Sequence, residues 1–325
     1  MKKPSLWSAI CAAALAFAAV AAEAQAAGWP TGPVKLIVPL AAGGSSDIAA
    51  RALAQGLSAR WKQPVVVENR TGGSTIIAAQ YVLGQPADGY TLDVFPTTHS
   101  INPGVRSSMP FDTMKDFSYA AMFMDAPMAI FANPKFPASS LEELIAEAKK
   151  HPDQPILFAS PGVASAGHMG GALLQSLTGI KLQHVAYTGS ATALPDVLSG
   201  RVPLFITPLT GLTQYVDNGQ LKLISVLGAA RAKQYPNVAA ASEIVPGLVV
   251  RAFTGIAVRA GTSPEVIQKI ADDTKAVVNS PEYAQVSNSA GFVPWVTSPK
   301  ETTDLMQHEV DQWKQIAAKQ DIHVK

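Results

Sequence analysis

Residues 34–61 of the chain read VKLIVPLAAGGSSDIAARALAQGLSARW. The first part, Val34–Pro39, is a short apolar run rich in β-branched residues, which is typical of a buried strand. From Asp47 to Trp61 the apolar residues recur at the helical period, which predicts a helix. The glycine-containing segment between them therefore connects a buried strand directly to a helix, and this unit is the building block of an α/β fold.

The same alternation of strand and helix continues along the chain. The patterns predict strands at residues 65–68, 90–95, 156–159, 182–186, 202–206, 221–227 and 253–258, and helices at residues 74–83, 165–177, 192–198 and 212–218. Three further helices have start signals: a capping box at residues 139–143, and the pairs Ser263-Pro264 and Ser298-Pro299. The fold class expected is α/β with mainly parallel sheets.

Parallel sheets bind ligands at the carboxyl ends of their strands, in the loops that lead into helices. The first such loop contains Gly43 and Gly44, which let backbone approach a ligand, and a helix start whose free N–H groups favour an anion. Ser45, Ser46 or Asp47 can cap that helix, so a capped turn without a ligand is the alternative. The loop lacks the glycine patterns of nucleotide-binding loops. Residues 69–74 (NRTGGS) form a second glycine-rich loop of the same kind.

Polar residues of other strand ends are candidates for the same site. They are Thr97, Thr98 and His99, then Ser160, Ser165 and His168, then Tyr187 and Thr188, and finally Thr207. Hydroxyl groups and backbone amides, rather than fixed charges, would hold the ligand. A histidine in such a loop is as readily structural, and the small residues around Ser165 let the helix start come close to a ligand.

Composition and motifs exclude several classes of function. Lys and Arg total 25 and Asp and Glu 24, so the chain lacks the basic excess of a nucleic-acid-binding protein. The single cysteine excludes a disulfide framework and a cysteine-rich metal site. The serine-nucleophile motif G-x-S-x-G and the H-E-x-x-H zinc motif are both missing from the sequence. No enzyme activity, cofactor or metal is expected.

The first 26 residues have the pattern of a secretory signal peptide. Lys2 and Lys3 precede the apolar run 6–22, and cleavage after Ala24 or Ala26 fits the small-residue rule. The alternative is a transmembrane anchor, but the run is short and no stop-transfer charges follow. Removing residues 1–26 leaves 23 basic and 23 acidic residues and no cysteine. The sequence therefore predicts an exported protein of the periplasm.

The order of motifs along the mature chain resembles the substrate-binding proteins of tripartite tricarboxylate transporters, the Bug-type receptors. The matching segments include residues 34–39, 43–51, 65–70, 87–92, 101–103, 115–117, 140–144, 184–187 and 219–221. The resemblance implies a two-lobed periplasmic-binding-protein fold of type II-like topology, with the ligand cleft between the lobes. Lobe 1 would comprise residues 28–128 plus 252–325, and lobe 2 residues 129–251.

The resemblance also implies roles for individual residues. The first glycine loop, here Ala41, Ala42, Gly43, Gly44, Ser45, Ser46 and Asp47, would cradle a carboxylate, with Asp47 capping the helix rather than touching the anion. The other candidates would complete the cleft from both lobes. Many relatives have an acidic residue where this chain has Thr207 and a lysine where it has Thr188. The loss of the acid argues against an amino-acid ligand and favours a mono- or dicarboxylate, aliphatic or aromatic.

The function implied is a monomeric receptor that delivers a small carboxylate to a membrane permease. A periplasmic sensor that signals to a membrane kinase would bind its ligand in the same way, so the sequence leaves both open. An exported hydrolase on a similar fold is a further alternative, which the missing catalytic motifs disfavour.

Overall fold

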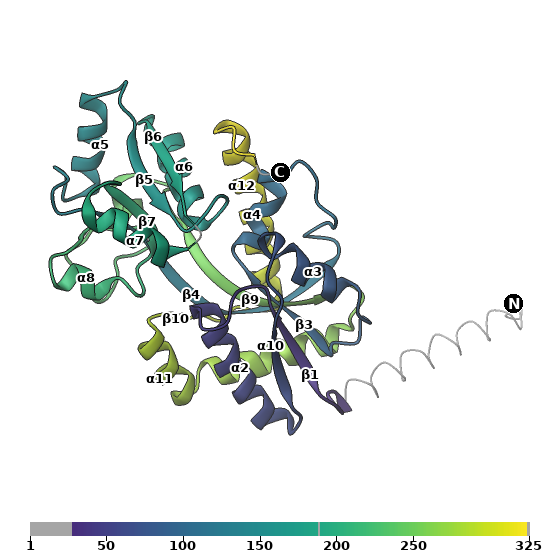
Figure 1. The fold of residues 1–325 in the computed structure, drawn as a ribbon. Helices are drawn as coiled ribbons and strands as arrows, with labels where there is room; N and C mark the ends of the chain where they lie inside the picture. The colour runs from purple at the N-terminus through teal and green to yellow at the C-terminus, as the bar shows by residue number, and fades with distance from the viewer. Residues whose placement is uncertain (1–27, 188, 324–325) are drawn as a thin grey trace, which may run out of the picture.

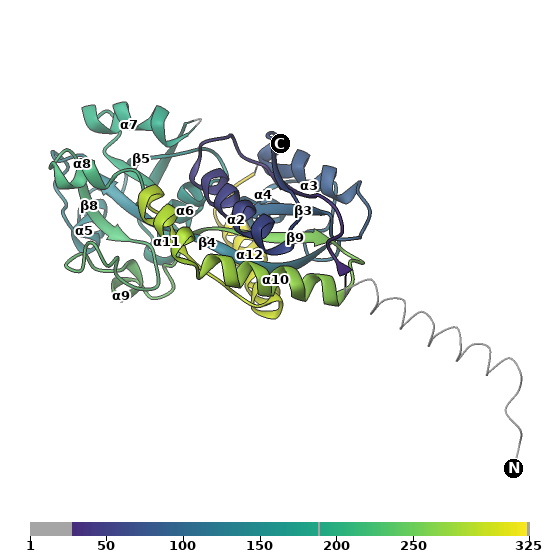
Figure 2. The ribbon, with the colours of Figure 1, turned by 90° about the horizontal axis from the view of Figure 1, so that it is seen from below.

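The computed structural model describes residues 28–187 and 189–323. The predicted signal peptide and Thr188 lie outside these residues. Within them, no helix is both long enough and apolar enough to cross a membrane. The chain forms two α/β halves, which Figures 1 and 2 show side by side.

The first half contains a sheet with the strand order β2-β1-β3-β9-β4. Its strands are β1 (Val34–Val38), β2 (Val65–Asn69), β3 (Thr91–Pro96), β4 (Phe117–Ala132) and β9 (Arg251–Arg259), with the short β10 (Val293–Pro294) against β4. β1 pairs in parallel with β2 and β3, whereas β9 is antiparallel to both β3 and β4. The carboxyl ends of β1, β2 and β3 therefore lie at one edge of the sheet.

The second half continues the strand order through β4-β7-β5-β6. Its strands are β5 (Ile156–Ser160), β6 (Leu182–Ala186), β7 (Leu204–Pro208) and β8 (Lys222–Val226). β5 is parallel to β6 and β7, while β7 and β8 pair with β4 in antiparallel fashion. The prediction of mainly parallel sheets is wrong for the middle of the structure, because the chain leaves the first half along β4 and returns along β9 in the opposite direction.

Strand β4 runs without interruption through both halves. Its first part pairs with β9 as far as Pro127, and its last residues, from Met128 onward, pair with β7 and β8. The returning chain stays close to it, since Leu227 N–H donates to Met128 O at 2.7 Å and Val250 N–H donates to Leu227 O at 2.8 Å. Both crossings between the halves are thus hydrogen-bonded backbone.

Helices cover both faces of each sheet. They are α2 (Ser45–Trp61), η1 (Gly73–Thr75), α3 (Ile76–Leu83), α4 (Thr98–Val105), α5 (Leu141–Lys150), α6 (Ala166–Thr178), α7 (Ser190–Ser199), α8 (Thr213–Asp217), α9 (Ala241–Ile244), α10 (Pro264–Val278), α11 (Pro281–Ala290) and α12 (Pro299–Lys319). In the first half, α2 and α10 pack their buried leucine, isoleucine and valine side chains on one face of the sheet, and α3 packs on the other. In the second half, α6 packs on one face of the sheet and α7 packs on the other.

The predicted helix starts are confirmed at their caps. Ser140, Ser263 and Ser298 each accept a hydrogen bond from the backbone N–H three residues on. Ser298 and Glu301 complete a reciprocal capping box, which satisfies two of the N–H groups that a helix start leaves free. β4, α4, α9 and α11 were not among the predicted elements.

Helix α12 belongs to both halves. It lies along α4 of the first half (Figure 1), and Trp313 and Ile316 are buried in the same apolar cluster as Phe158 and Leu204 of the second half. Lys319 Nζ donates to Ser176 O at 2.9 Å. The C-terminal helix is therefore a third connection between the halves, beside the two backbone crossings.

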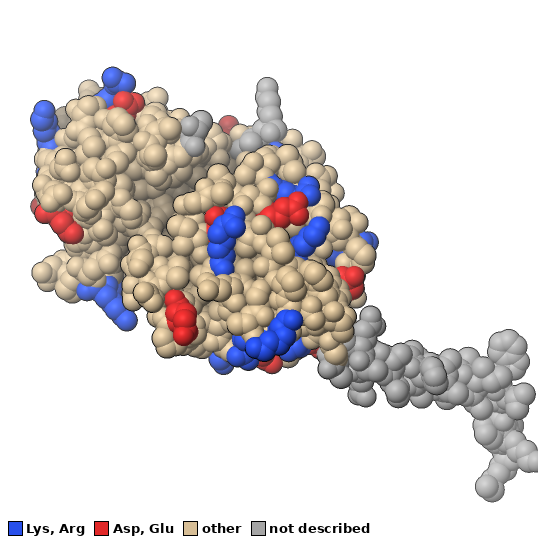
Figure 3. All heavy atoms as spheres, turned by 60° about the horizontal axis from the view of Figure 1, so that its bottom comes forward, with Lys and Arg blue, Asp and Glu red and all other residues tan. Residues whose placement is uncertain are grey.

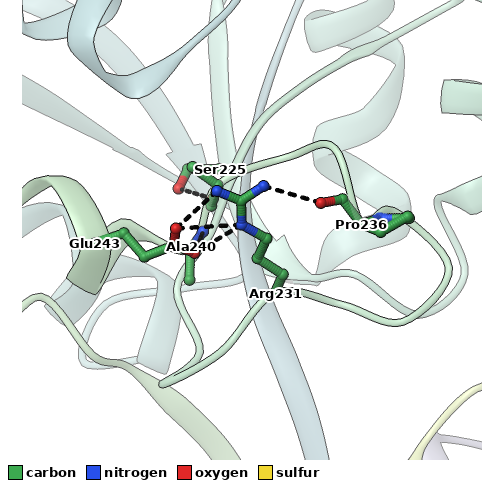
Figure 4. A network of polar contacts seen from close by, with 6 residues as sticks. Ser225, Arg231, Pro236, Ala240 and Glu243 are labelled. Atoms are coloured by element: carbon green, nitrogen blue, oxygen red, sulfur yellow. Dashed lines mark hydrogen bonds and ion pairs between the residues drawn. The ribbon is translucent and has the colours of Figure 1, made fainter.

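Hydrogen bonds from one arginine, Arg231, order the long connection between β8 and α9. Arg231 donates to both carboxylate oxygens of Glu243 and to Pro236 O, and Ala240 N–H donates to Glu243 Oε1 at 3.0 Å (Figure 4). Both side chains of this ion pair are nearly half exposed, so the pair orders the loop and contributes little to stability.

Candidate functional site between the two halves

A cavity of about 460 Å³ lies between the halves and is lined by residues of both. From the first half these residues are Pro39, Leu40, Ala41, Thr71, Gly72, Ser74, Thr75 and Thr98; from the second half they are Pro161, Gly162, Val163, Ala164 and Ser165. They follow the carboxyl ends of β1, β2, β3 and β5, which is where the sequence predicted a ligand site.

None of the residues that line the cavity carries a charge. Three of them stand at helix starts instead: Thr75 is the N-cap of α3, Thr98 is the first residue of α4, and Ser165 is the N-cap of α6. The N-terminal end of a helix presents unpaired N–H groups and a partial positive charge, which favour an anion. Two of these helix starts come from the first half and one from the second.

The first glycine loop contributes Ala41 to the cavity lining, whereas Asp47 turns away from the cavity and is almost fully buried. Asp47 Oδ2 accepts hydrogen bonds from Gly43 N–H and from Arg51 Nε, both at 2.9 Å, and Oδ1 accepts one from Asn69 at 2.8 Å. Ala42, Gly43, Gly44, Ser45 and Ser46 are not lining residues in this structure. The N-cap of α2 is Gly44, without a side-chain hydrogen bond, so the expectation that Asp47 caps this helix is wrong; its carboxylate instead accepts from Gly43 N–H in the preceding loop.

Replacing Asp47 with asparagine should destabilise the protein by about 2 kcal/mol at pH 7, because an amide nitrogen would face the donors at Oδ2. Burial acts to raise the pKa of Asp47, but the hydrogen bonds from Arg51, Gly43 and Asn69 outweigh it and hold the pKa below 3.8. The carboxylate therefore stabilises the fold above about pH 4 and this contribution is lost at lower pH. Urea unfolding at pH 7 and pH 3 measures both effects. Asp304→Asn, in an exposed ion pair with Lys300, is the control and should cost at most about 0.5 kcal/mol.

Neighbouring residues of the segment after β3 point in different directions, some toward the cavity and others into the core. Thr98 lines the cavity, but Thr97 is buried, and its Oγ1 accepts a hydrogen bond from Phe253 N–H at 2.8 Å. His99 is only 2% exposed and packs among Phe95, Phe111, Phe117 and Tyr119. The prediction that His99 lines the cleft is therefore wrong for this structure, because the first turn of α4 directs it into the core.

In the second half Ser165 lines the cavity, while Ser160 and His168 lie behind the lining loop. Ser160 is fully buried, with Oγ 2.7 Å from His184 Nε2 and 3.2 Å from Ser165 Oγ. His168 Nδ1 accepts a hydrogen bond from Ala164 N–H at 3.1 Å. Although a serine–histidine contact is the pattern of an activated nucleophile, the burial of Ser160 keeps its hydroxyl from the cavity.

Tyr187 and Thr207, two further predicted residues, lie outside the lining set. Tyr187 Oη donates to Asp196 at 2.7 Å, and buried Thr207 shares a hydrogen bond of 2.8 Å with Ser190. Thr207 lies within β7 opposite Ala129 of β4, so it is a residue of the sheet interior.

The lining residues that were missed are Pro39 and Leu40 after β1, residues 161–164 after β5, and four residues of the segment between β2 and α3, which are Thr71, Gly72, Ser74 and Thr75. The sequence drew attention to residues 69–74 as a glycine-rich loop, but their part in the cavity depends on α4. Asn102 is buried and donates to Ser74 O at 2.7 Å, and Arg106 donates to Gly73 O. Ser74 and Thr75 have left-handed φ values of 52° and 80°, a conformation that this support from α4 maintains.

A larger hollow of about 920 Å³ lies on the first half alone, between α2, α10 and α11. A ligand there would contact only the first half. On the face drawn in Figure 3 the surface is also hollowed between the halves, and the charged side chains are scattered in small groups rather than gathered into one patch. The cavity between the halves is therefore the candidate site.

Comparisons with known proteins agree on one family. A family model described as "Tripartite tricarboxylate transporter family receptor" matches residues 49–322. Protein BugT of Bordetella pertussis is 29% identical over 302 residues, which cover 92% of each chain. The solved structure of R. palustris Rpa4515 with adipate has a TM-score of 0.78 and 29% identity, covering 91% of this chain and 99% of that one. The periplasmic binding protein BugD has a TM-score of 0.75 and 27% identity, covering 91% of this chain and all of that one.

Proposed function

Since this chain belongs to the tripartite tricarboxylate transporter receptor family, a family of substrate-binding receptors with a two-lobed periplasmic-binding-protein fold, we propose that it binds a small dicarboxylate. The observation that carries the proposal is the cavity between the halves, which has no charged lining residue and three helix starts at its wall. The ligand would be held by backbone N–H groups and hydroxyls.

The lining residues also favour an anion over a zwitterion. An ammonium group taken out of water needs a carboxylate or several acceptors, and the lining contains no acidic side chain. The nearest acidic residue of the first loop, Asp47, already accepts hydrogen bonds from Gly43, Arg51 and Asn69. Amino acids should therefore bind much more weakly than diacids of the same length.

The placement of the helix starts argues for two carboxylates. Thr75 and Thr98 stand in the first half and Ser165 stands in the second, so each half offers its own site for an anion. The leucine, proline and valine residues between them can pack against a short hydrocarbon chain. The R. palustris relative solved with adipate, a six-carbon diacid, is consistent with such a ligand.

Ligand capture would close the two lobes around the ligand. In this proposal lobe 1 comprises residues 28–128 and 252–325 and lobe 2 residues 129–251, with bending at the crossings near Met128 and Val250. A ligand that contacts both lobes stabilises the closed form by its extra contacts there. Because α12 also contacts the second lobe, its last turns would have to slide along α6 during closure.

Delivery to a membrane permease completes the proposed role. The predicted signal peptide would export the protein to the periplasm, where the monomer would present its closed, liganded form to the permease.

A matched ligand series tests the proposal by isothermal titration of the mature protein. Adipate, hexanoate and 6-aminohexanoate share one chain length and differ only in the second end group; phthalate adds an aromatic diacid. Adipate or a near homologue should bind at least 100-fold more tightly than 6-aminohexanoate, which corresponds to about 2.7 kcal/mol. Equal affinity for hexanoate would reduce the proposal to a single carboxylate site. Preference for the amino acid, or no binding of any acid, would overturn it.

A further inference from the structure

Two stacked histidines lie directly behind the loop that lines the second-half wall of the cavity. The rings of His168 (α6) and His184 (β6) are 3.8 Å apart between centroids and inclined by 13°. Neither residue is a lining residue, and the function proposed above does not use them. All of residues 161–165, by contrast, line the cavity.

His168 supports the loop at a point of backbone strain. Ala164 has a φ of 59°, in the left-handed region that residues other than glycine rarely occupy. Its N–H donates to His168 Nδ1 at 3.1 Å, and the Ala164 side chain is buried. Since Nδ1 accepts this hydrogen bond, a neutral His168 carries its proton on Nε2.

His184 supports the same loop from Ser160, the last residue of β5. Its Nε2 lies 2.7 Å from Ser160 Oγ, and that oxygen also contacts Gly162 N–H and Ser165 Oγ, both at 3.2 Å. Ser160 therefore joins β5, the loop and the N-cap of α6 at one buried point. Burial lowers the pKa of His168 to about 4; burial and the neighbouring His168 lower the pKa of His184 to about 3, so both rings are neutral near pH 7.

We infer that His168 and His184 are positioning residues of the ligand site: through their ring nitrogen atoms they hold residues 160–165 in the shape that binds the ligand, His168 through Ala164 and His184 through Ser160. The inference rests on the proposed function for the identity of the site. Its geometric core, that these two rings order the loop, is independent of which ligand the protein takes.

The inference is tested with variants that keep either the aromatic ring or the hydrogen-bonding atom of a histidine, but not both. His168→Phe keeps an aromatic ring for stacking and removes the acceptor for Ala164 N–H, whereas His168→Asn removes the ring and keeps an oxygen near the position of Nδ1. His184→Phe removes the contact with Ser160 and keeps the stack. His151→Asn, at the exposed C-terminal end of α5, is the control.

The first readout needs no ligand. Hydrogen exchange of the unliganded protein over residues 161–168 should become about tenfold faster in His168→Phe and His184→Phe, should stay within about threefold of wild type in His168→Asn, and should not change in His151→Asn. Exchange in the rest of the second half should stay as in wild type. Unchanged loop exchange in both phenylalanine variants would overturn the inference, as would a general acceleration across the whole half.

The second readout is adipate affinity by titration. The phenylalanine variants should bind adipate about tenfold more weakly, with His168→Asn restored to within about threefold of wild type. Wild-type protein that fails to bind adipate would count against the choice of probe and the proposed function, while the exchange experiment would still decide the role of the histidines. Wild-type affinity in both phenylalanine variants would show that the histidines do not position the site.

Discussion

Gly167→Ala is expected to destabilise the protein by about 3 kcal/mol and to abolish the proposed dicarboxylate binding. A Cβ atom at position 167 would lie 2.1 Å from Ile206 O and 3.1 Å from Ile206 C. Both are backbone atoms of the central strand β7, so neither can move aside, and the start of α6 would have to lift off the sheet. Overpacking of this kind typically costs about 1–3 kcal/mol, and rigid backbone puts this site at the upper end.

The loss of binding follows from the position of Gly167 in the first turn of α6. Ser165 is the N-cap of this helix and lines the cavity, so displacing the helix start displaces one wall of the site. Urea unfolding measures the stability, and titration with adipate under conditions where the variant is folded measures the binding.

Gly170→Ala is the matched control for this experiment. It lies one turn further along α6, where a Cβ atom would come no closer than 3.3 Å, to the Leu227 Cδ1 atom at the end of a flexible side chain. Alanine is a better helix former than glycine by about 1 kcal/mol, so this variant should stay within about 1 kcal/mol of wild type. Equal stability of the two variants would contradict the proposed close approach of α6 to β7.

Asp93→Asn is expected to stabilise the protein increasingly as the pH rises. Asp93 lies on β3 with 2% exposure; its Oδ2 atom has no hydrogen-bond partner, and His99 Nδ1 is 4.0 Å away. Burial raises the pKa of Asp93 from 3.8 to about 7, because the charged form loses its hydration. In the wild type, ionisation of this carboxyl group does not lower the free energy of unfolding below about pH 4. The loss of unfolding free energy grows as the pH rises toward 7 and then stays constant.

The difference between a pKa of 3.8 and a pKa of about 7 corresponds to about 4 kcal/mol of unfolding free energy. The advantage of Asp93→Asn should therefore be under about 1 kcal/mol at pH 4 and about 4 kcal/mol at pH 8. Unfolding free energies of both proteins across this range test the prediction. Asp272→Asn, at an exposed residue of α10, is the control. A difference that is independent of pH would show that Asp93 is paired or hydrated in solution.

Much of the local structure could be predicted from the sequence. Ser140, Ser263 and Ser298 cap helices as expected, because a cap involves residues only three positions apart. The sequence also pointed to the strand ends where the cavity between the halves lies, because each strand–loop–helix unit is contained in one short stretch of chain. The loop residues Ala41, Thr98 and Ser165 accordingly line the cavity.

The direction in which individual side chains point could not be predicted. Thr98 and His99 are neighbours in the chain, yet one lines the cavity and the other is buried among aromatic rings of β3, β4 and the segment before it. Ser160 and His168 have the polar character of ligand-binding residues, but His184, from the adjacent strand, holds one and stacks on the other. Such contacts join residues that are 16 or 24 positions apart.

The sequence by itself determined the α/β units, their caps and the strand-end loops that line the cavity, because these depend on periodicity and on hydrogen bonds between near neighbours. The tertiary structure decided the rest. It made residues 117–132 one strand through both halves, placed α12 against both, and chose Thr75, Thr98 and Ser165 as the helix starts that surround the cavity. These features depend on burial and pairing between segments distant in the chain, which no local pattern records.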